Sequence, residues 1–478
     1  MNNSRRKFLI STTAGLSVPW VLCLKKGIAG ETASEFISPV PRQLAWQQRE
    51  FTAFAHFTVN TFTDKEWGDG TESPAQFNPT AFDAGQWVET CKNAGMKMII
   101  LTAKHHDGFC LWPGKYTEHS VKNSPFVKGK GDIVKAVSDA CSAGGLKFGI
   151  YLSPWDRHES SYGTSAYNQY YLNQLNELLT SYGEISEVWF DGAKGENAKD
   201  MEYDFNAYRS LVRKLQPSAV MFSDEGPDVR WIGNERGIAG ETCWSTMDRS
   251  KVSIGHADTN YLNAGDPEGH DWVPGECDVS IRPGWFYHSS EDEKVKTVQQ
   301  LIEIYYNSVG RNCVLLLNVP LDRRGLMYET DAARLREFRS VIDETFKSNL
   351  LEGKSFNAAS GSITPKTATY RPGIVWSPDI ASKEEWIEFD LKKPVTFDRA
   401  MIQEQIEHGQ RVNSFAIDIW DGSSWQRITK ATTIGYKRLL RFPPVQSQKV
   451  RFTIIDSRAT PRISAMGIYK ASPGEKNT

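Results

Sequence analysis

AFDAGQWVETCKNAGMKMIILTAKHH, residues 81–106, joins a helical pattern to a strand pattern. Apolar residues recur at spacings of three and four up to Gly95, which is typical of an amphipathic helix that ends on glycine. The run that follows is almost continuously apolar, as in a strand buried on both faces. It ends on a lysine and two histidines. The stretch therefore predicts a helix, a buried strand, and polar residues at the carboxyl end of that strand.

The same alternation continues from about residue 50 to residue 346. Strand-like runs cover 51–59, 96–105, 146–154, 186–192, 218–226 and 313–320, and helix-like runs cover 81–95, 131–145, 165–183, 204–217, 291–310 and 329–349. Such alternation predicts βα units around a parallel sheet, either closed into a barrel or open and doubly wound. Because no glycine-rich phosphate-binding loop follows any strand, the nucleotide-binding form of the open sheet loses support.

Polar and charged residues follow many of the strand-like runs. They are His56, residues 104–107, residues 155–158, Asp191, Asp224, Glu225 and Asn318. Active sites of β/α barrels lie at the carboxyl ends of their strands, where these residues would gather. We therefore predict a (β/α) TIM-like barrel over residues 31–349, with an active face at this end.

The pattern changes after residue 350. Short strand-like runs such as WIEFDL (386–391), FAIDIW (415–420) and KVRFTII (449–455) are separated by turns, and helical periodicity is nearly absent. This pattern is typical of an antiparallel β-sandwich or jelly roll. We predict such a domain over residues 350–478.

Residues 1–30 have the pattern of a twin-arginine signal peptide. Arg5 and Arg6 precede a short apolar stretch that ends in small residues. Cys23 follows the bulky Leu22, which argues against a lipoprotein anchor. The apolar stretch is too short for an ordinary membrane span, and we see no other candidate. We predict a periplasmic or secreted protein without a membrane span.

Composition disfavours several classes of function. The net charge of −2 gives no long-range attraction to nucleic acid or anionic membranes. The cysteines form no C-x-x-C pair and no H-x-H motif follows an early strand, so we expect neither a zinc cluster nor a catalytic metal. Fifteen tryptophans are either core residues or platforms for sugar rings.

Asp191 ends the buried run in EISEVWFDGA, residues 184–193. An Asp-Gly pair is by itself a common turn, but at the end of a barrel strand it would lie on the active face. Glycosidases use two carboxyl groups about the anomeric carbon, so a partner is needed. Spacing alone does not choose among the carboxyls that follow, although the setting of Glu235, shortly after Trp231 and Gly233, could raise its pKa. The candidates are Asp224, Glu225, Asp228, Glu235 and Glu241.

The motifs together resemble a known family of enzymes. HFTVNTF (56–62), TAKHHDGFCLW (102–112), GIYLSPWDRH (149–158), VWFDGA (188–193), WIGNE (231–235) and RPGWFYH (282–288) follow the order of alpha-L-fucosidases of glycoside hydrolase family 29. The resemblance covers about residues 40–346, and the tail resembles the galactose-binding-like sandwich often attached to that barrel. It implies a retaining exo-α-L-fucosidase without metal or cofactor, acting on fucosylated oligosaccharides or glycoconjugates.

The resemblance also implies a role for each matching residue. Asp191 corresponds to the nucleophile and Trp285 to an aromatic residue near the fucose methyl group. Glu66 and Trp67 correspond to a pair at the rim that contacts the sugar. The residues that hold the fucose hydroxyls correspond to His56, His105, His106 and Tyr151.

The acid/base varies between branches of the family. RWIGNERG and ECDVSIRPGWFYH are similar to the branch selective for α-1,3- and α-1,4-linked fucose, in which Glu235 is the acid/base. In the broader branch the candidates would be Glu225, Glu241 or Glu276. Two other classes stay open from the residues alone, a metal-dependent barrel hydrolase and a secreted glycan-binding protein without catalysis.

Overall fold

Eight parallel strands form a closed barrel in the computed structural model, which describes residues 36–379 and 384–475. Around the barrel the strands follow the order β1-β10-β9-β6-β5-β4-β3-β2. Their bounds are β1 Phe51–Ala55, β2 Met98–Lys104, β3 Lys147–Leu152, β4 Glu187–Trp189, β5 Val220–Ser223, β6 Val229–Trp231, β9 Gly275–Ser280 and β10 Val314–Asn318. The predicted TIM-like barrel is confirmed.

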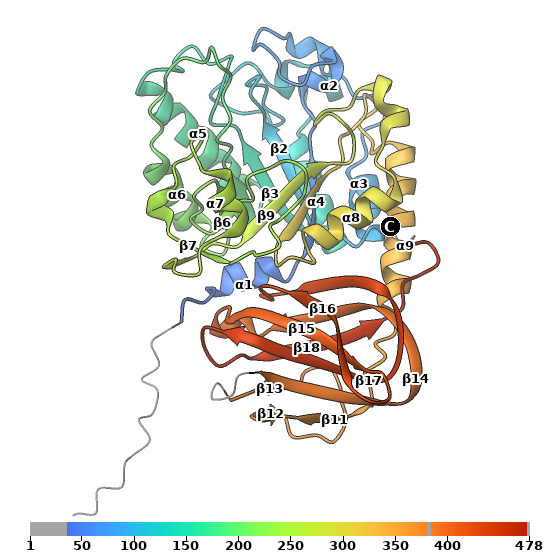
Figure 1. Ribbon diagram of the computed structural model, residues 1–478. Helices are drawn as coiled ribbons and strands as arrows, with labels where there is room; N and C mark the ends of the chain where they lie inside the picture. Colours follow the sequence, from blue (N-terminus) through green and yellow to red (C-terminus); the bar gives the residue numbers. More distant parts are fainter. Residues whose placement is uncertain (1–35, 380–383, 476–478) are drawn as a thin grey trace, which may run out of the picture. The chain divides into compact units, whose positions relative to one another are not determined.

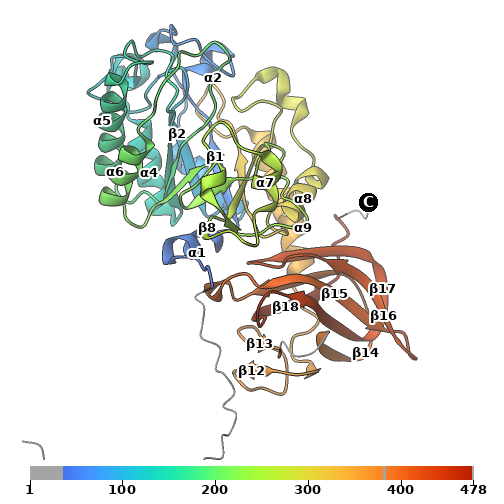
Figure 2. The same cartoon turned by 60° about the vertical axis from the view of Figure 1, so that its left-hand side comes forward.

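The larger helices lie outside the barrel strands (Figures 1 and 2). Asp83, Asp132 and Asp204 begin three of them as N-caps, because each carboxylate accepts hydrogen bonds from free N–H groups of the first turn. No helix among the described residues is long and apolar enough to cross a membrane. The helices are α1 Pro41–Gln47, α2 Val59–Thr63, α3 Ala84–Asn93, α4 Ile133–Gly144, α5 Ala166–Ser181, α6 Phe205–Leu215, α7 Thr259–Ala264, α8 Val298–Asn307 and α9 Glu329–Phe346.

Two barrel strands, β6 and β9, were not among the strand-like runs of the sequence. In β9, the buried Glu276 and Asp278 alternate with apolar residues, so the strand lacks the continuous hydrophobicity of its neighbours. In the three-residue β6, Arg230 is fully buried and hydrogen-bonds the carbonyl oxygens of Leu262 and Trp244. Buried charged residues, rather than an altered topology, explain why the hydrophobic pattern missed these two strands.

Aromatic side chains fill the barrel interior. Phe54, Trp189 and Phe222 belong to one buried cluster, in which the rings of Trp189 and Phe222 are stacked at 4.1 Å. Trp46 of α1 is fully buried in the same cluster. The interior is therefore a packed core, and a site can form only above it, at the carboxyl ends of the strands.

The C-terminal strands form an antiparallel β-sandwich, as predicted. They pair in the order β12-β13-β18-β14-β17-β15-β16, and β11 pairs with β14. Their core is separate from that of the barrel and includes Trp376, Phe389 and Phe452. The predicted run 449–455 falls in the longer strand β17. The bounds are β11 Ser355–Ala358, β12 Ser362–Thr364, β13 Val375–Ser377, β14 Glu385–Glu404, β15 Val412–Trp420, β16 Trp425–Ala431, β17 Arg438–Ser457 and β18 Ile463–Tyr469; a small pair, β7 Thr246–Met247 and β8 Asp271–Trp272, lies outside both sheets.

Candidate active site

A cavity of about 270 Å³ lies over the carboxyl ends of the barrel strands. It brings together eight of the nine predicted site residues, which lie in or after six different strands. Aromatic rings and polar groups share its wall, as in sites that bind a small polar ring. The lining residues are Phe54, His56, Trp67, His105, His106, Tyr151, Trp189, Asp191, Ala193, Glu235, Asp278 and Trp285.

Asp191 lies two residues beyond the end of β4 and is held by two donors. The Tyr151 hydroxyl donates to Oδ2 at 2.9 Å, and the Ala193 backbone N–H donates to Oδ1 at 2.8 Å. A Cβ on Gly192 would lie 3.0 Å from the Asp224 carboxylate and from the Gly255 backbone nitrogen. The backbone at Gly192 is therefore packed tightly against both groups. The carboxylate therefore has a fixed orientation toward the cavity.

Three buried histidines line the wall beside Asp191. Burial lowers the pKa of His56 to about 3 and that of His106 to about 4, and it lowers the pKa of His105 well below the usual value. All three are neutral near pH 7, so each ring can donate one hydrogen bond and accept another. The Nδ1 atom of His105 has no protein partner among the described residues. Neutral imidazoles of this kind suit the hydroxyl groups of a sugar.

Hydrogen bonds to the protein fix two of these rings. His56 Nδ1 lies 2.9 Å from Asn318 Oδ1 at the end of β10. His106 Nδ1 lies 2.8 Å from Ser153 Oγ, and its Nε2 lies 3.6 Å from Asp191 Oδ2. One nitrogen of each ring is thus engaged, and the other is left for a ligand.

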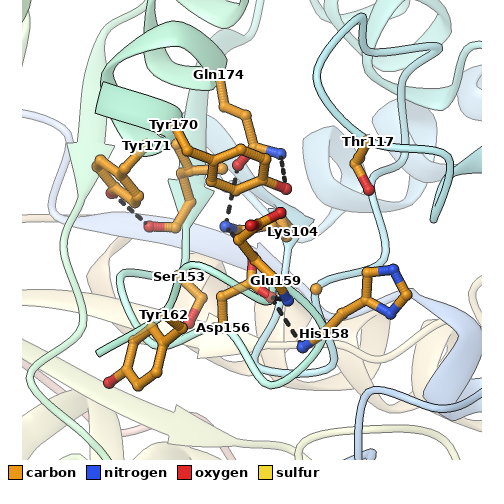
Figure 3. Close-up of polar contacts among 12 residues, drawn as sticks. Lys104, Thr117, Ser153, Asp156, His158, Glu159, Tyr162, Tyr170, Tyr171 and Gln174 are labelled. Carbon is orange, nitrogen blue, oxygen red and sulfur yellow. Dashed lines mark hydrogen bonds and ion pairs between the residues drawn. The ribbon is translucent and has the colours of Figure 1, made fainter. Parts of the chain in front are cut away.

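A buried ion pair joins Lys104 to Asp156 close to the site (Figure 3). Lys104 Nζ, fully buried at the end of β2, lies 2.8 Å from Asp156 and 3.0 Å from Gln174. Asp156 also accepts hydrogen bonds from the backbone N–H groups of His158 and Glu159. The pair joins the end of β2 to the loop after β3, which fixes the His106–Ser153 contact between them.

Glu66 is the one predicted site residue that does not line the cavity. Its carboxylate accepts hydrogen bonds from the backbone N–H groups of Trp285 and Phe286, at 2.8 and 3.0 Å, and lies 2.7 Å from His288 Nε2. Trp67, directly after it, is 46% exposed and packs edge-to-face on His106. Glu66 therefore positions Trp285, while Trp67 forms part of the wall.

Glu235 faces the cavity from the loop after β6. Burial of its carboxyl raises the pKa; a hydrogen bond from the Trp285 side chain opposes this shift, and the charges of Asp191 and Glu66 add to it. A raised pKa is what a general acid requires.

The other carboxyls considered for this role do not line the cavity. Glu225 is paired with Arg209, and Glu241 is exposed beside Arg311. Glu276 is fully buried in the barrel, where it accepts a hydrogen bond from Trp189 Nε1 at 2.9 Å. Among the acid/base candidates, the geometry favours Glu235.

Sequence reasoning missed one carboxyl of the site. Asp278 of β9 lines the cavity and accepts a hydrogen bond from Trp231 Nε1 at 2.9 Å. Asp224, predicted on the active face and as a candidate partner for Asp191, does not line the cavity; it is buried behind Gly192, and burial raises its pKa to about 6. The alternation of polar and apolar residues in 275–280 was the one available signal for Asp278. Among the described residues, no group of three or more histidine, cysteine or acidic side chains is arranged to hold a metal ion.

Comparisons with known proteins show the family to which the chain belongs. Residues 34–343 match the family model for alpha-L-fucosidases, and residues 348–466 match the model for F5/8 type C domains. Alpha-L-fucosidase 1 of Arabidopsis thaliana is 48% identical over 459 residues, which cover 92% of this chain and 90% of the relative. The chain belongs to the alpha-L-fucosidase family.

Solved structures of the alpha-L-fucosidase family match this chain over both domains. A glycoside hydrolase 29 family member from an unknown rumen bacterium is 42% identical with a TM-score of 0.82, and the match covers 91% of this chain and 78% of that one. The family 29 fucosidase of Ruminococcus gnavus, solved in complex with fucose, is 33% identical with a TM-score of 0.83 over 92% and 96% of the chains. Membership in glycoside hydrolase family 29 and the galactose-binding-like type of the sandwich are confirmed.

Proposed function

We propose that the protein is a retaining exo-α-L-fucosidase with Asp191 as nucleophile and Glu235 as acid/base. The observation that carries the proposal is that these two carboxyls line one cavity, together with His56, His105 and His106. At about 270 Å³ the cavity is smaller than the range of about 300–1,000 Å³ typical of sites for drug-sized ligands. That volume suits a single terminal sugar.

In the first step, Asp191 Oδ attacks C1 of the fucosyl ring. The bond from C1 to the glycosidic oxygen breaks, and Glu235 donates its proton to that oxygen as the acceptor leaves. Tyr151 and the Ala193 N–H keep the attacking carboxylate in position. The product of this step is an ester between Asp191 and fucose.

In the second step, the ionised Glu235 removes a proton from a water molecule. The water oxygen bonds to C1, the ester bond breaks, and Asp191 leaves as a carboxylate. The pKa of Glu235 is lower in the ester, because the charge of Asp191 that raises it has been neutralised. One residue can thus act first as an acid and then as a base.

Proton NMR of the first-formed sugar tests the retaining mechanism. With para-nitrophenyl α-L-fucoside, two inversions at C1 give α-L-fucose first, before mutarotation. Initial release of β-L-fucose would overturn the mechanism. An Asp191→Ala variant should lose activity about 10³-fold or more, and azide, which fits the space left by the carboxylate, should restore part of it.

The proposed substrates are glycans with α-1,3- or α-1,4-linked terminal fucose. This preference is supported by the motifs around Glu235 and Trp285. Fucose release should be measured on oligosaccharides with α-1,2, α-1,3, α-1,4 and α-1,6 links. Activity on α-1,2 or α-1,6 links alone would overturn the preference. The roles of His56, His105, His106, Tyr151, Trp67 and Trp285 in holding the sugar belong to the same proposal, and that of Glu66 becomes indirect, through Trp285.

Two further parts of the proposal have simple tests. We propose hydrolysis without a metal, so activity should survive dialysis against a chelator; loss that zinc restores would favour a metal-dependent hydrolase. We also propose export by the twin-arginine signal at residues 1–30, which lie outside the described residues. Replacing Arg5 and Arg6 by lysine should retain the protein in the cytoplasm.

A further inference from the structure

Tryptophan side chains hold a series of carboxyls inside the barrel. In each pair an indole N–H donates to a buried carboxyl, at 2.7–2.9 Å. Within the described residues the pairs are Trp46 with Glu187, Trp189 with Glu276, and Trp231 with Asp278. Two of these carboxyls, Glu276 and Asp278, lie on the same face of β9 because side chains two residues apart in a strand point the same way.

Only one carboxyl of this series reaches the cavity. Asp278 lines it, whereas Glu187 and Glu276 do not. Asp278 is 3% exposed, and within the described part of the chain Trp231 is the only side chain that hydrogen-bonds it. No basic side chain pairs with it there, although a buried carboxylate ordinarily needs a cation or several donors.

The protonation of Asp278 fits this setting. Burial raises its pKa well above the usual range, and the charges of Glu235 and Asp191 raise it further. A raised pKa favours the protonated form of the carboxyl. In that form it has an acceptor oxygen for the Trp231 indole and an O–H group that can donate to a ligand.

We propose that Asp278 is a sugar-binding residue of the active site, hydrogen-bonded to one hydroxyl of the fucosyl ring and oriented by Trp231. The inference rests on the proposed function and adds a third carboxyl to Asp191 and Glu235. The proposal also explains why a carboxyl, rather than an apolar residue, occupies this position of β9. An alternative role would be structural only, as an acceptor for the Trp231 indole.

Protein variants combined with substrates that lack single hydroxyl groups separate the two roles. The values of kcat/KM are measured for the wild type, Asp278→Ala and Asp278→Asn with para-nitrophenyl α-L-fucoside and its three monodeoxy analogues, each lacking one ring hydroxyl. A direct contact predicts that Asp278→Ala lowers kcat/KM about 10- to 100-fold on the parent fucoside. On the one analogue that lacks the contacted hydroxyl, the loss should shrink to about threefold or less.

A structural role predicts a different pattern, because a displaced Trp231 affects every substrate. Equal losses on the parent and all three analogues would overturn the proposal. Asp278→Asn keeps an oxygen for the Trp231 indole and offers N–H donors in place of the O–H group, so it should retain most of the wild-type kcat/KM. Asp278→Leu serves as the test variant if Asp278→Ala fails to fold, and its loss must also depend on one hydroxyl. If the wild type does not hydrolyse the parent fucoside, the proposed function fails instead.

Glu276→Gln is the matched control. It changes a carboxyl on the same face of the same strand, also held by an indole, that lies outside the cavity. Its effect on kcat/KM should be uniform across the four substrates. A loss that depends on the same hydroxyl as that of Asp278→Ala would show an indirect effect through β9 and would contradict the proposed contact.

Discussion

The Tyr151 hydroxyl donates a hydrogen bond to Asp191 Oδ2 at 2.9 Å, across the neighbouring strands β3 and β4. The contact follows from the register of the barrel, because Tyr151 is paired with Trp189. Asp191 lies two residues beyond Trp189 and so points to the same side of the strand. The orientation of the proposed nucleophile is thus set by the pairing of two buried strands.

Tyr151→Phe should lower kcat about 10- to 100-fold, because it removes one donor to a carboxylate and keeps the ring. The melting temperature should change little, since the ring packs against Phe54 and Trp189 and these contacts remain. Steady-state kinetics on para-nitrophenyl α-L-fucoside, with thermal unfolding of both proteins, checks this expectation. Wild-type kcat in the variant would show that the hydroxyl does not position the nucleophile.

Glu235→Gln should change the pH dependence of the reaction. Since the acid must be protonated, wild-type kcat/KM should fall as pH rises through the pKa of Glu235, which is raised above its usual value. In the variant this alkaline decline should disappear. Activity should fall by about 10²–10⁴-fold on a fucosylated oligosaccharide and by less on para-nitrophenyl α-L-fucoside, whose leaving group needs no proton.

Glu225→Gln is the control for that experiment. Glu225 lies outside the cavity and is paired with Arg209, so its loss should leave the pH profile unchanged. A profile in which Glu225→Gln, rather than Glu235→Gln, removes the alkaline decline would transfer the acid/base role to Glu225.

The buried pair Glu187 and Glu276 should make stability depend on pH. Burial raises the pKa of Glu187 to about 7 and that of Glu276 well above its usual value of 4.5. Between about pH 4.5 and 7 the folded protein therefore binds protons that the unfolded chain has released, so the unfolding free energy falls as pH rises through this range. Glu276→Gln removes one of these titrations and should flatten the decline.

Thermal unfolding between pH 5 and pH 8 measures this effect. From pH 5 to pH 8 the free energy of unfolding should fall less in Glu276→Gln than in the wild type, by on the order of 1 kcal/mol. Parallel curves for the wild type and Glu276→Gln would mean that the pair does not titrate between these pH values in the folded protein.

Lys104→Met should destabilise the protein by about 3–5 kcal/mol, because it leaves the buried Asp156 without its cation. The double variant Lys104→Met/Asp156→Asn should recover part of this loss, since the buried charge is then removed. Lys135→Met breaks an exposed ion pair with Asp139 and should cost less than about 1 kcal/mol. Urea unfolding measures all three; a similar cost for the Lys104 and Lys135 variants would refute a special role for the buried pair.

Much of the barrel could be predicted from the sequence, because its helices are amphipathic and most of its strands are continuously apolar. Asp191 and the histidines after β2 could be predicted as site residues for the same reason, since each follows an easily identified strand. The strand β9 could not, because Glu276 and Asp278 interrupt its apolar pattern.

Two features of the site could not be predicted from the sequence: the place of Asp278 and the contact of Glu66. Asp278 belongs to a strand that was not identified, so its place on the cavity wall could not be inferred. The contact of Glu66 with the backbone of Trp285 joins residues 219 positions apart in the chain. Contacts of this kind depend on the three-dimensional arrangement of loops, which periodicity does not encode.

Trapping of the intermediate tests the central claim, that Asp191 is the nucleophile, most directly. The wild-type protein is incubated with 2-deoxy-2-fluoro-α-L-fucosyl fluoride, whose fluorine slows hydrolysis of the ester, and the labelled peptide is sequenced by mass spectrometry. We predict one fluorofucosyl group per chain, attached to Asp191, and no label in Asp191→Ala. A label on Asp224, Glu235 or Asp278, or an unlabelled protein that still hydrolyses para-nitrophenyl α-L-fucoside, would contradict the account.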